Sequence, residues 1–188
     1  MVDAKTFRDA MSRLAAAVNI ITSNGPGGLS GCTASAVCSV SDEPPILLVC
    51  INRASRNNAV FKKNGRLCVN VLRAGQQDIA MLFAKSLGDA SAHERFIDAA
   101  WSDEKPRTLE KPGTVEEQHA TLPALTSALV SLDCDITDSA EVGSHTVFYC
   151  HVEHVRIGTE GPALLYYERS FQPLPHPLAS IAEHAHPR

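Results

Sequence analysis

The stretch Cys-Thr-Ala-Ser-Ala-Val-Cys-Ser-Val at residues 32–40 decides the fold of this chain. Its alternation predicts one strand whose even-numbered face carries Cys32, Ala34, Ala36, Cys38 and Val40. The opposite face carries Thr33, Ser35, Val37 and Ser39. Because these side chains are small, a planar ring can approach the backbone closely. We therefore interpret the stretch as part of a cradle for a flat anionic ligand.

A second strand and a short helix follow this stretch. The apolar run Ile46–Ile51 is typical of a strand that is buried on both faces. Ser55 is placed to cap a helix from Arg56 to about Lys63, and Asn64 and Gly65 provide its end.

The start of this helix favours a phosphate group. A helix N-terminus offers unpaired N–H groups and a partial positive charge. Arg53 and Arg56 add full positive charges beside it. Taken one at a time, these features are better explained by an ordinary packed strand, a hairpin turn and a helix cap.

Two further helices are predicted from apolar residues that recur every three or four positions. The first runs from about Lys5 to Ala17 and carries one apolar face, which includes Phe7 and Met11. The second runs over residues 76–87, and Gly88 follows it.

The remaining regular segments are predicted to be strands, at residues 18–23, 66–72, 129–137, 146–157 and 162–167. The strand at 129–137 alternates as a half-buried strand does, with Ser131, Asp133, Asp135 and Thr137 on its polar face. A change of phase near Glu153 and His154 predicts a bulge. Residues 102–119 are expected to form a surface loop, and the tail from Pro173 is expected to be mobile. Without βαβ alternation, the chain is predicted to be mainly β, a small antiparallel barrel with peripheral helices.

The overall charge excludes some classes of partner. A formal charge of −4 and an isoelectric point near 6.0 argue against nucleic acid or an anionic membrane as partner. No apolar run approaches the ~20 residues of a membrane span, and no export signal is recognisable, so we expect a cytoplasmic protein.

The six cysteines are expected to be reduced thiols in the core. No pair has metal-ligand spacing, so no disulfide and no metal site is predicted. His184 and His186 lie in the tail, where we favour a solvated segment over a metal site. A cysteine-dependent hydrolase is an alternative, although nothing near Cys32 or Cys134 supplies a base.

Several segments in order resemble the short-chain flavin reductases, over roughly residues 6–171. The segments that carry the resemblance are residues 7–11, 16–22, 33–40, 49–52 and 67–72. Within that family the chain is most similar to the reductase components of two-component aromatic hydroxylases, such as 4-hydroxyphenylacetate 3-monooxygenase. The resemblance implies a split antiparallel β-barrel of the FMN-binding type over residues 1–173, followed by the tail at 174–188.

The resemblance also implies the activity. It is NAD(P)H-dependent reduction of FMN or FAD, with NADH as the expected donor and reduced flavin passed to a separate aromatic monooxygenase. A homodimer is implied as well. A flavin-binding module without reductase activity is the alternative.

The same resemblance implies the site residues. His145, in the loop Val142–Thr146, corresponds to a histidine near the flavin and the nicotinamide, where the family usually has Gly-Asp-His; here Ser144 replaces the aspartate. A role that depended on a carboxylate beside this histidine is therefore not carried over. The cofactor-binding residues implied are Thr33, Ala34, Ser35, Cys50, Asn52, Ser55, Arg56, Phe83, Ala84, Arg169 and Phe171. No G-x-G-x-x-G follows a strand, so Rossmann-type nucleotide binding is not expected.

Overall fold

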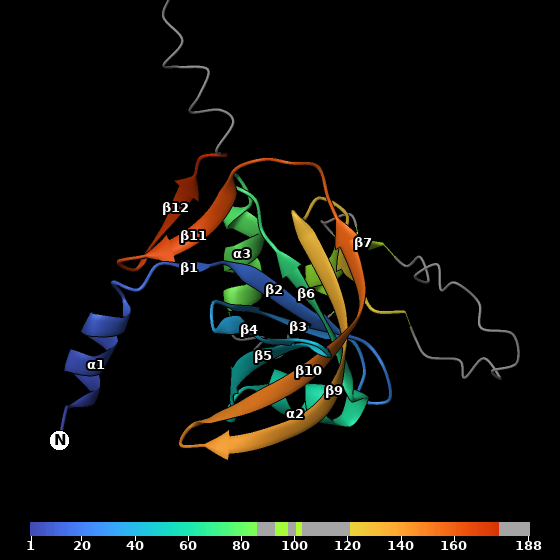
Figure 1. Ribbon diagram of the computed structural model, residues 1–188, viewed down its shortest axis with the longest axis horizontal. Helices are drawn as coiled ribbons and strands as arrows, with labels where there is room; N and C mark the ends of the chain where they lie inside the picture. Colours follow the sequence, from blue (N-terminus) through green and yellow to red (C-terminus); the bar gives the residue numbers. More distant parts are fainter. Residues whose placement is uncertain (86–92, 98–100, 103–120, 177–188) are drawn as a thin grey trace, which may run out of the picture.

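The computed structural model describes residues 1–85, 93–97, 101–102 and 121–176. Its main sheet has seven strands in the order β3-β2-β6-β9-β10-β5-β4, each antiparallel to its neighbours (Figure 1). Their bounds are Asn19–Ser23 (β2), Ser30–Ala34 (β3), Val37–Asp42 (β4), Pro45–Asn52 (β5), Arg66–Val71 (β6), Val130–Val142 (β9) and His145–Ile157 (β10).

Strands β3 and β4 are the two edges of this sheet, although they follow one another in the chain. Two residues, Ser35 and Ala36, connect them. The link brings one edge next to the other, and the sheet therefore curls into a barrel that is split between β3 and β4. The predicted antiparallel β-barrel with peripheral helices is confirmed.

The single strand predicted over residues 32–40 is wrong, because it breaks at this link. Ala34 and Val37 both pack against the barrel core, so the alternation shifts by one position across the break. Past the break, Cys38 and Val40 are exposed and do not share the inward face of Cys32 and Ala34.

The barrel core is apolar and is formed by alternate residues of several strands and by Phe61. On β5, Leu47, Val49 and Ile51 are buried, whereas the residues between them are partly exposed. The prediction that this strand is buried on both faces is therefore wrong. Its neighbours β4 and β10 continue the sheet around the barrel, so one face of β5 points outward.

The polar face predicted for β9 is not solvated along its whole length. Ser131 and Asp133 are 3% and 2% exposed. Ser131 Oγ donates to Asn70 Oδ1 at 2.9 Å, and Asp133 accepts two hydrogen bonds from Arg156, at 2.6 and 2.9 Å. Buried polar groups need such partners, and here neighbouring strands supply them. The predicted bulge is confirmed by the register shift between Val152 and His154.

A separate three-stranded sheet covers one end of the barrel and has the order β1-β11-β12. Its strands are Ala16–Ala17 (β1), Ala163–Tyr167 (β11) and Ser170–Leu174 (β12). The strand at residues 162–167 is thus not the last one. Pro173 and Leu174, expected to begin a mobile tail, belong to β12. Residues 177–188 lie outside the described part of the chain.

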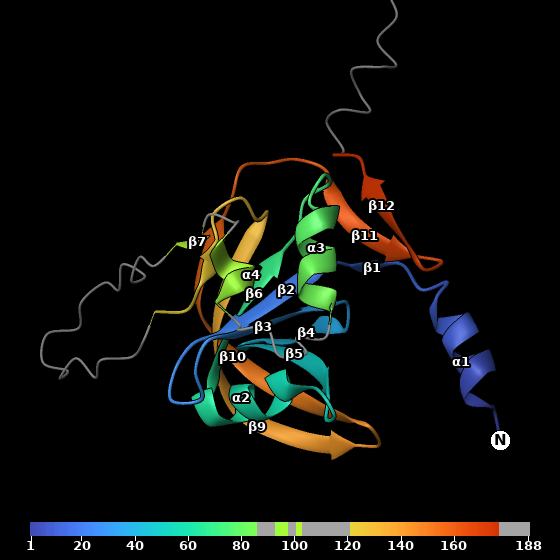
Figure 2. The same ribbon diagram turned by 180° about the vertical axis from the view of Figure 1, so that it is seen from behind.

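The N-terminal helix α1 is Ala4–Met11 and is shorter than predicted, since Ala16 and Ala17 pair with β11 instead. The helix lies beside the small sheet and away from the barrel (Figures 1 and 2). None of its residues is buried. The predicted apolar face exists, but Phe7, Met11 and Leu14 are 59%, 45% and 63% exposed.

The other helices are α2 (Arg56–Asn64), α3 (Gln77–Ala84) and α4 (Glu94–Ile97). Ser55 caps α2 and Gly65 ends it with φ 67°, as predicted. Helix α3 ends earlier than predicted, because Lys85 is already extended; residues 86–92 are outside the described part. Strands β7 (Trp101–Ser102) and β8 (Ala124–Leu125) pair, so Ser102 is not in the predicted loop, whose residues 103–119 are not described. No helix in the described ranges has the length and apolar character to span a membrane.

Candidate functional site

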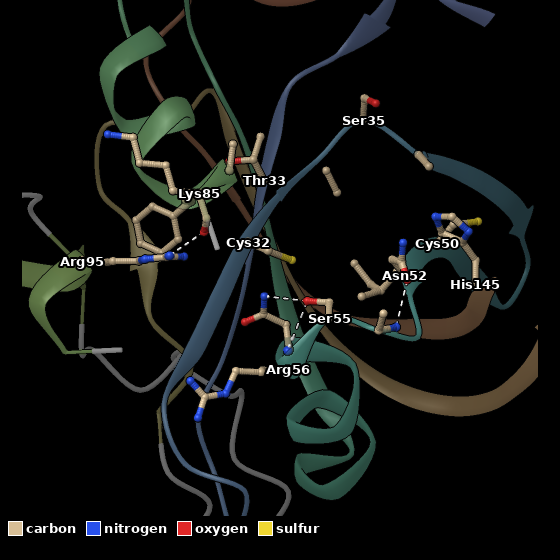
Figure 3. Close-up of a pocket in the computed structure, with 17 residues that line it drawn as sticks. Cys32, Thr33, Ser35, Cys50, Asn52, Ser55, Arg56, Lys85, Arg95 and His145 are labelled. Atoms are coloured by element: carbon tan, nitrogen blue, oxygen red, sulfur yellow. Dashed lines mark hydrogen bonds between the residues drawn. The ribbon is translucent and has the colours of Figure 1, made fainter. Parts of the chain in front are cut away.

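A cavity of about 560 Å³ opens at the split of the barrel, in the range usual for small-molecule sites. The link between β3 and β4, the end of β5, the starts of α2 and β10, the end of α3, and α4 enclose it. Its lining residues are Cys32, Thr33, Ala34, Ser35, Ala36, Cys50, Ile51, Asn52, Ala54, Ser55, Arg56, Asn57, Phe83, Ala84, Lys85, Arg95 and His145 (Figure 3).

His145 stands at the rim, as the first residue of β10, directly opposite Asn52 of β5. Its Nδ1 shares a 2.9 Å hydrogen bond with Ser144 Oγ. The backbone N–H of Arg53 donates to the Ser144 carbonyl at 2.9 Å, which fixes the hairpin tip to the end of β5. The replacement of the family's usual aspartate by Ser144 therefore leaves the imidazole with a neutral hydrogen-bond partner.

The N-terminus of α2 forms the floor of the cavity. Ser55 Oγ accepts from the Asn57 backbone N–H at 3.3 Å and from Asn57 Nδ2 at 3.1 Å. Asn52 Oδ1 accepts from the Ala54 N–H at 2.9 Å, so the turn into the helix is also fixed by a side chain. Asn58 Nδ2 donates to the Ile51 carbonyl at 3.1 Å and attaches the helix to β5.

The far wall is made by α3 and β3. Thr33 Oγ1 donates to the Ala80 carbonyl at 2.6 Å, so this hydroxyl already joins the strand to the helix. Phe83 is 1% exposed and packs edge-on against Phe96 at 5.1 Å between ring centroids. The Phe83 ring therefore packs mostly behind the cavity wall and exposes little surface to a ligand.

The charges around the cavity have one sign. Three cationic side chains line it, those of Arg56, Lys85 and Arg95, and no carboxylate stands among the lining residues that the structure describes. The chain as a whole carries a formal charge of −4. The cavity is thus a local positive region in an acidic protein, which suits an anionic ligand.

The model of the family described as "Flavin reductase like domain" matches residues 11–175. The chain belongs to this family. It is 49% identical over 186 residues to the FMN reductase (NADH) RutF 1 of Methylorubrum extorquens strain PA1, covering 99% of this chain and 84% of that protein.

Solved structures of similar fold agree with this membership. The flavin reductase PheA2 superposes with a TM-score of 0.73 at 28% identity, over 92% of this chain and 99% of that chain. BorF, the flavin reductase component of a bacterial two-component tryptophan halogenase, has a TM-score of 0.78 at 24% identity, over the same shares of the two chains. The split-barrel fold, the assignment as an NAD(P)H:flavin oxidoreductase, and FMN or FAD with NADH as cofactors are confirmed.

The cavity of this flavin reductase fits a flavin on its own chemistry. A flavin nucleotide combines a flat neutral ring with a phosphate. The cavity combines small side chains at the β3–β4 link with a helix N-terminus and three cations. When bound, the flavin supplies an acceptor for the electrons of the reduced nicotinamide.

Most residues implied by the family resemblance come together here. The cavity is lined by Thr33, Ala34, Ser35, Cys50, Asn52, Ser55, Arg56, Phe83, Ala84 and His145. Arg169 and Phe171 do not line it: Arg169 pairs with Asp9 of α1, and Phe171 packs against Tyr166 at 5.4 Å in the small sheet. Within one copy of this flavin reductase, these two residues are thus separate from the cavity.

Sequence reasoning missed Lys85, Arg95 and Asn57. Lys85 directly follows the implied pair Phe83 and Ala84, so extending that motif by one residue would have found it. Asn57 is the second residue of the predicted helix and directly follows the implied residues Ser55 and Arg56, so extending that motif by one residue would have found it. No local signal marks Arg95, because its place depends on how α4 packs against α3.

The cysteines of the flavin reductase do not favour nucleophilic chemistry. Burial raises the pKa of Cys32 to about 12, although Arg95 lowers it, and burial raises that of Cys150 to about 12. Burial likewise raises the pKa of Cys50, Cys68 and Cys134. All six thiols are free. Since the thiolate is the nucleophile, these five thiols, which include Cys32 and Cys134, do not support the hydrolase alternative. Among the described residues no cluster of three or more His, Cys, Asp or Glu is arranged to hold a metal.

Proposed function

We propose that this chain catalyses the reduction of FMN by NADH and releases the reduced flavin to a separate monooxygenase. The observation that carries the proposal is a cavity with three cations and no carboxylate among its described lining residues, and with a histidine at its rim, in a member of the flavin reductase family. NADH is proposed as the donor because the relative from Methylorubrum extorquens is named an NADH enzyme.

Each part of the cavity has a separate role in this proposal. The backbone of Thr33, Ala34 and Ser35 lies along the flavin ring. The α2 N-terminus at Ser55 and Arg56 holds the phosphate, since it supplies N–H groups and positive charge. Both nucleotides must be held in contact for electron transfer, and this positioning is the protein's main contribution.

His145 is proposed to orient the nicotinamide. Its Nδ1 is occupied by Ser144, and the described residues offer no partner for Nε2. That nitrogen is therefore available to a substrate group at the rim. The partner at position 144 is a hydroxyl and not a carboxylate, so the proposed role of the imidazole is to orient the nicotinamide through a hydrogen bond.

A steady-state assay tests the proposal directly. Purified protein should oxidise NADH when FMN, FAD or riboflavin is added, and should be inactive without added flavin. Absence of turnover with every flavin would reject the proposal. Flavin binding without NADH oxidation would instead support a flavin-binding module. Repeating the assay with NADPH decides the choice of donor.

Replacing His145 tests its role. His145→Ala should lower kcat/KM by about 10²-fold, the usual result of misplaced reacting groups. His151→Ala is the matched control, since His151 lies on the same strand, outside the cavity, and pairs with Glu153. Equal activity of the His145 variant and the wild type would remove this residue from the mechanism.

The recipient of the reduced flavin is proposed to be an aromatic monooxygenase of the two-component type, such as an enzyme that hydroxylates 4-hydroxyphenylacetate. Support comes from the sequence resemblance and from BorF, a reductase component that serves an enzyme acting on tryptophan. A phenol monooxygenase component given this protein, FMN and NADH should hydroxylate its substrate. Failure with several phenols would leave the reductase activity and remove this partner class.

A homodimer is proposed from the outward apolar surface of the chain. The exposed face of α1 and the partly exposed residues Leu48 and Cys50 on the outer side of β5 would be covered by a second copy. Sedimentation at micromolar concentration should give twice the monomer mass. We further propose one domain over the expected residues 1–173, extended by Leu174 at the end of β12, and a cytoplasmic location, which the six free thiols support.

A further inference from the structure

Arg95 is a buried cation that faces the cavity. It belongs to α4, is 7% exposed, and lies at the cavity wall together with Lys85 (Figure 3). Its Nη2 donates to the Lys85 carbonyl. In the described part of the chain no carboxylate pairs with it. A guanidinium carries five N–H donors, and within the described ranges the bond to Lys85 is the one hydrogen bond that Arg95 donates.

A buried cation such as Arg95 costs free energy unless an anion or several hydrogen bonds compensate its charge. An isolated buried cation loses hydration, and one neutral carbonyl does not restore it. Consistent with this, burial lowers the pKa of Arg95, although the neighbouring Cys32 opposes the shift. The geometry therefore provides a place for an anion that is not part of the protein.

Packing holds Arg95 in place before any ligand binds. Its neighbour Phe96 contacts Phe83 at 5.1 Å and Trp101 at 4.8 Å between ring centroids. Gly31 of β3 permits this packing, since a Cβ there would stand 2.7 Å from a Phe83 ring carbon. Packing thus holds the Arg95 guanidinium in position, so this side chain loses little conformational entropy when a ligand binds.

The cavity is polarised along its length. Figure 3 shows Arg95 and Lys85 on one side of Cys32, and His145 with Asn52 and Cys50 on the other side. The second group is formally neutral when histidine is uncharged. FMN has a neutral ring at one end and, at neutral pH, a phosphate with a charge of about −1.5 to −2 at the other. Its ring therefore fits the His145 side and its phosphate the Arg95 side.

We propose that Arg95 binds the flavin phosphate and makes the cavity select phosphorylated flavins over riboflavin. This inference rests on the proposed function, because it assumes that a flavin occupies the cavity. It adds to the α2 N-terminus a buried guanidinium that can bind two phosphate oxygens at once. Selection arises because riboflavin, which lacks the phosphate, leaves this cation uncompensated.

Flavin titrations without NADH test the inference. Quenching of flavin fluorescence gives the Kd for FMN and for riboflavin. Arg95→Gln should raise the Kd for FMN by about 10- to 100-fold, the worth of a hydrogen bond to a charged group, and change the Kd for riboflavin by less than about 3-fold. Arg95→Lys should restore part of the FMN affinity. Equal weakening of both ligands, or an unchanged Kd for FMN, would overturn the assignment.

A matched variant and a competition experiment complete the test. Arg66→Gln removes a cation that pairs with Asp135 outside the cavity and should change neither Kd. In the wild type, inorganic phosphate should compete with FMN and leave riboflavin binding unchanged, which tests the inference even if the Arg95 variants do not fold. Phosphate that displaces both flavins, or neither, contradicts it. If the wild type binds no flavin at all, the proposed function fails, whereas binding without phosphate selectivity removes this inference alone.

Discussion

The side chains of Asn70 and Arg95 are both buried, but they differ in how far their hydrogen-bonding capacity is used. Asn70 Nδ2 donates to the Ile20 carbonyl at 3.1 Å and to Thr22 Oγ1 at 3.3 Å. Its Oδ1 accepts from the Leu125 N–H at 2.8 Å and from Ser131 Oγ at 2.9 Å. This cluster is satisfied by the protein itself. Among the residues that the structure describes, Arg95 has one acceptor, the neutral Lys85 carbonyl, and it lines the cavity.

The difference separates structure from function among buried polar groups. The Asp133 carboxylate is satisfied in the same way, since both of its oxygens accept from Arg156, although Arg156 Nε has no hydrogen-bond partner among the described residues. Substitutions in the satisfied clusters should affect folding, because each leaves a partner unpaired. Substitutions at the cavity should affect ligands more than folding. Four variants test or refine this contrast.

Asp133→Ala should have the largest effect. It leaves the partly buried guanidinium of Arg156 without its carboxylate, which should lower the free energy of unfolding by about 3–5 kcal/mol in a urea titration. Asp138→Ala, at an exposed position of the same strand, should change it by less than about 0.5 kcal/mol. If adding Arg156→Met to Asp133→Ala recovers no stability, the loss does not come from an unpaired charge.

Asn70→Leu should come next. The side chains have similar volume, but the leucine leaves the Leu125 N–H and the Ser131 hydroxyl without an acceptor. Each unsatisfied group costs about 1–3 kcal/mol, so a loss of about 2–4 kcal/mol is expected. Flavin affinity of the folded fraction should stay at the wild-type value. A selective loss of flavin affinity would mean that this cluster also serves the site.

Gly31→Ala should have a smaller effect on stability and should also reach the ligand. The added Cβ would stand 2.7 Å from a ring carbon of Phe83 and 3.2 Å from one of Phe96, and overpacking of this kind costs about 1–3 kcal/mol. Since Phe96 adjoins Arg95, FMN should bind more weakly than to the wild type. Gly161→Ala is the control, because its nearest atom is 3.6 Å away in the Arg73 side chain. Equal thermal stability of the two alanine variants would contradict the close packing.

Glu141→Gln should have the smallest effect, visible in its pH dependence. Hydrogen bonds from Lys62 and then Arg53 hold the pKa of Glu141 below its usual 4.5. A lowered folded-state pKa gives stabilisation that is present above about pH 4.5 and is lost as the pH falls through the lower value. The wild type should therefore melt higher than the variant at pH 7, and the difference should shrink as the pH falls below about 4.5. A difference that persists at about 1 M salt would contradict an exposed ion pair.

The sequence predicted those parts of the molecule that depend on neighbouring residues. Helix α2 was located from Ser55 and Gly65, and the bulge in β10 from a change of phase at residues 153–154. Ten of the implied site residues line one cavity, because they lie at the ends of elements whose order the sequence already defines.

What the sequence did not show depends on distant partners. The break at Ser35 and Ala36 follows from closure of the barrel, and alternation alone cannot reveal it. The burial of Asp133 follows from Arg156, which is 23 residues away in the chain. Arg95 reaches the cavity through aromatic packing between three separate segments. Charged residues in these positions look like surface residues until their partners are known.

The two-residue link between the edge strands has a consequence for the protein without its ligand. β3 and β4 each have one neighbouring strand, so the remaining amides of both strands lack a ladder partner on the side of the split. Amide hydrogens along this seam should exchange with solvent faster than those of the central strands β6 and β9. A flavin bound in the cavity would contact the end of β3 and the link at Ser35 and Ala36, so that occupancy of the site would be measurable as slower exchange at residues 32–36.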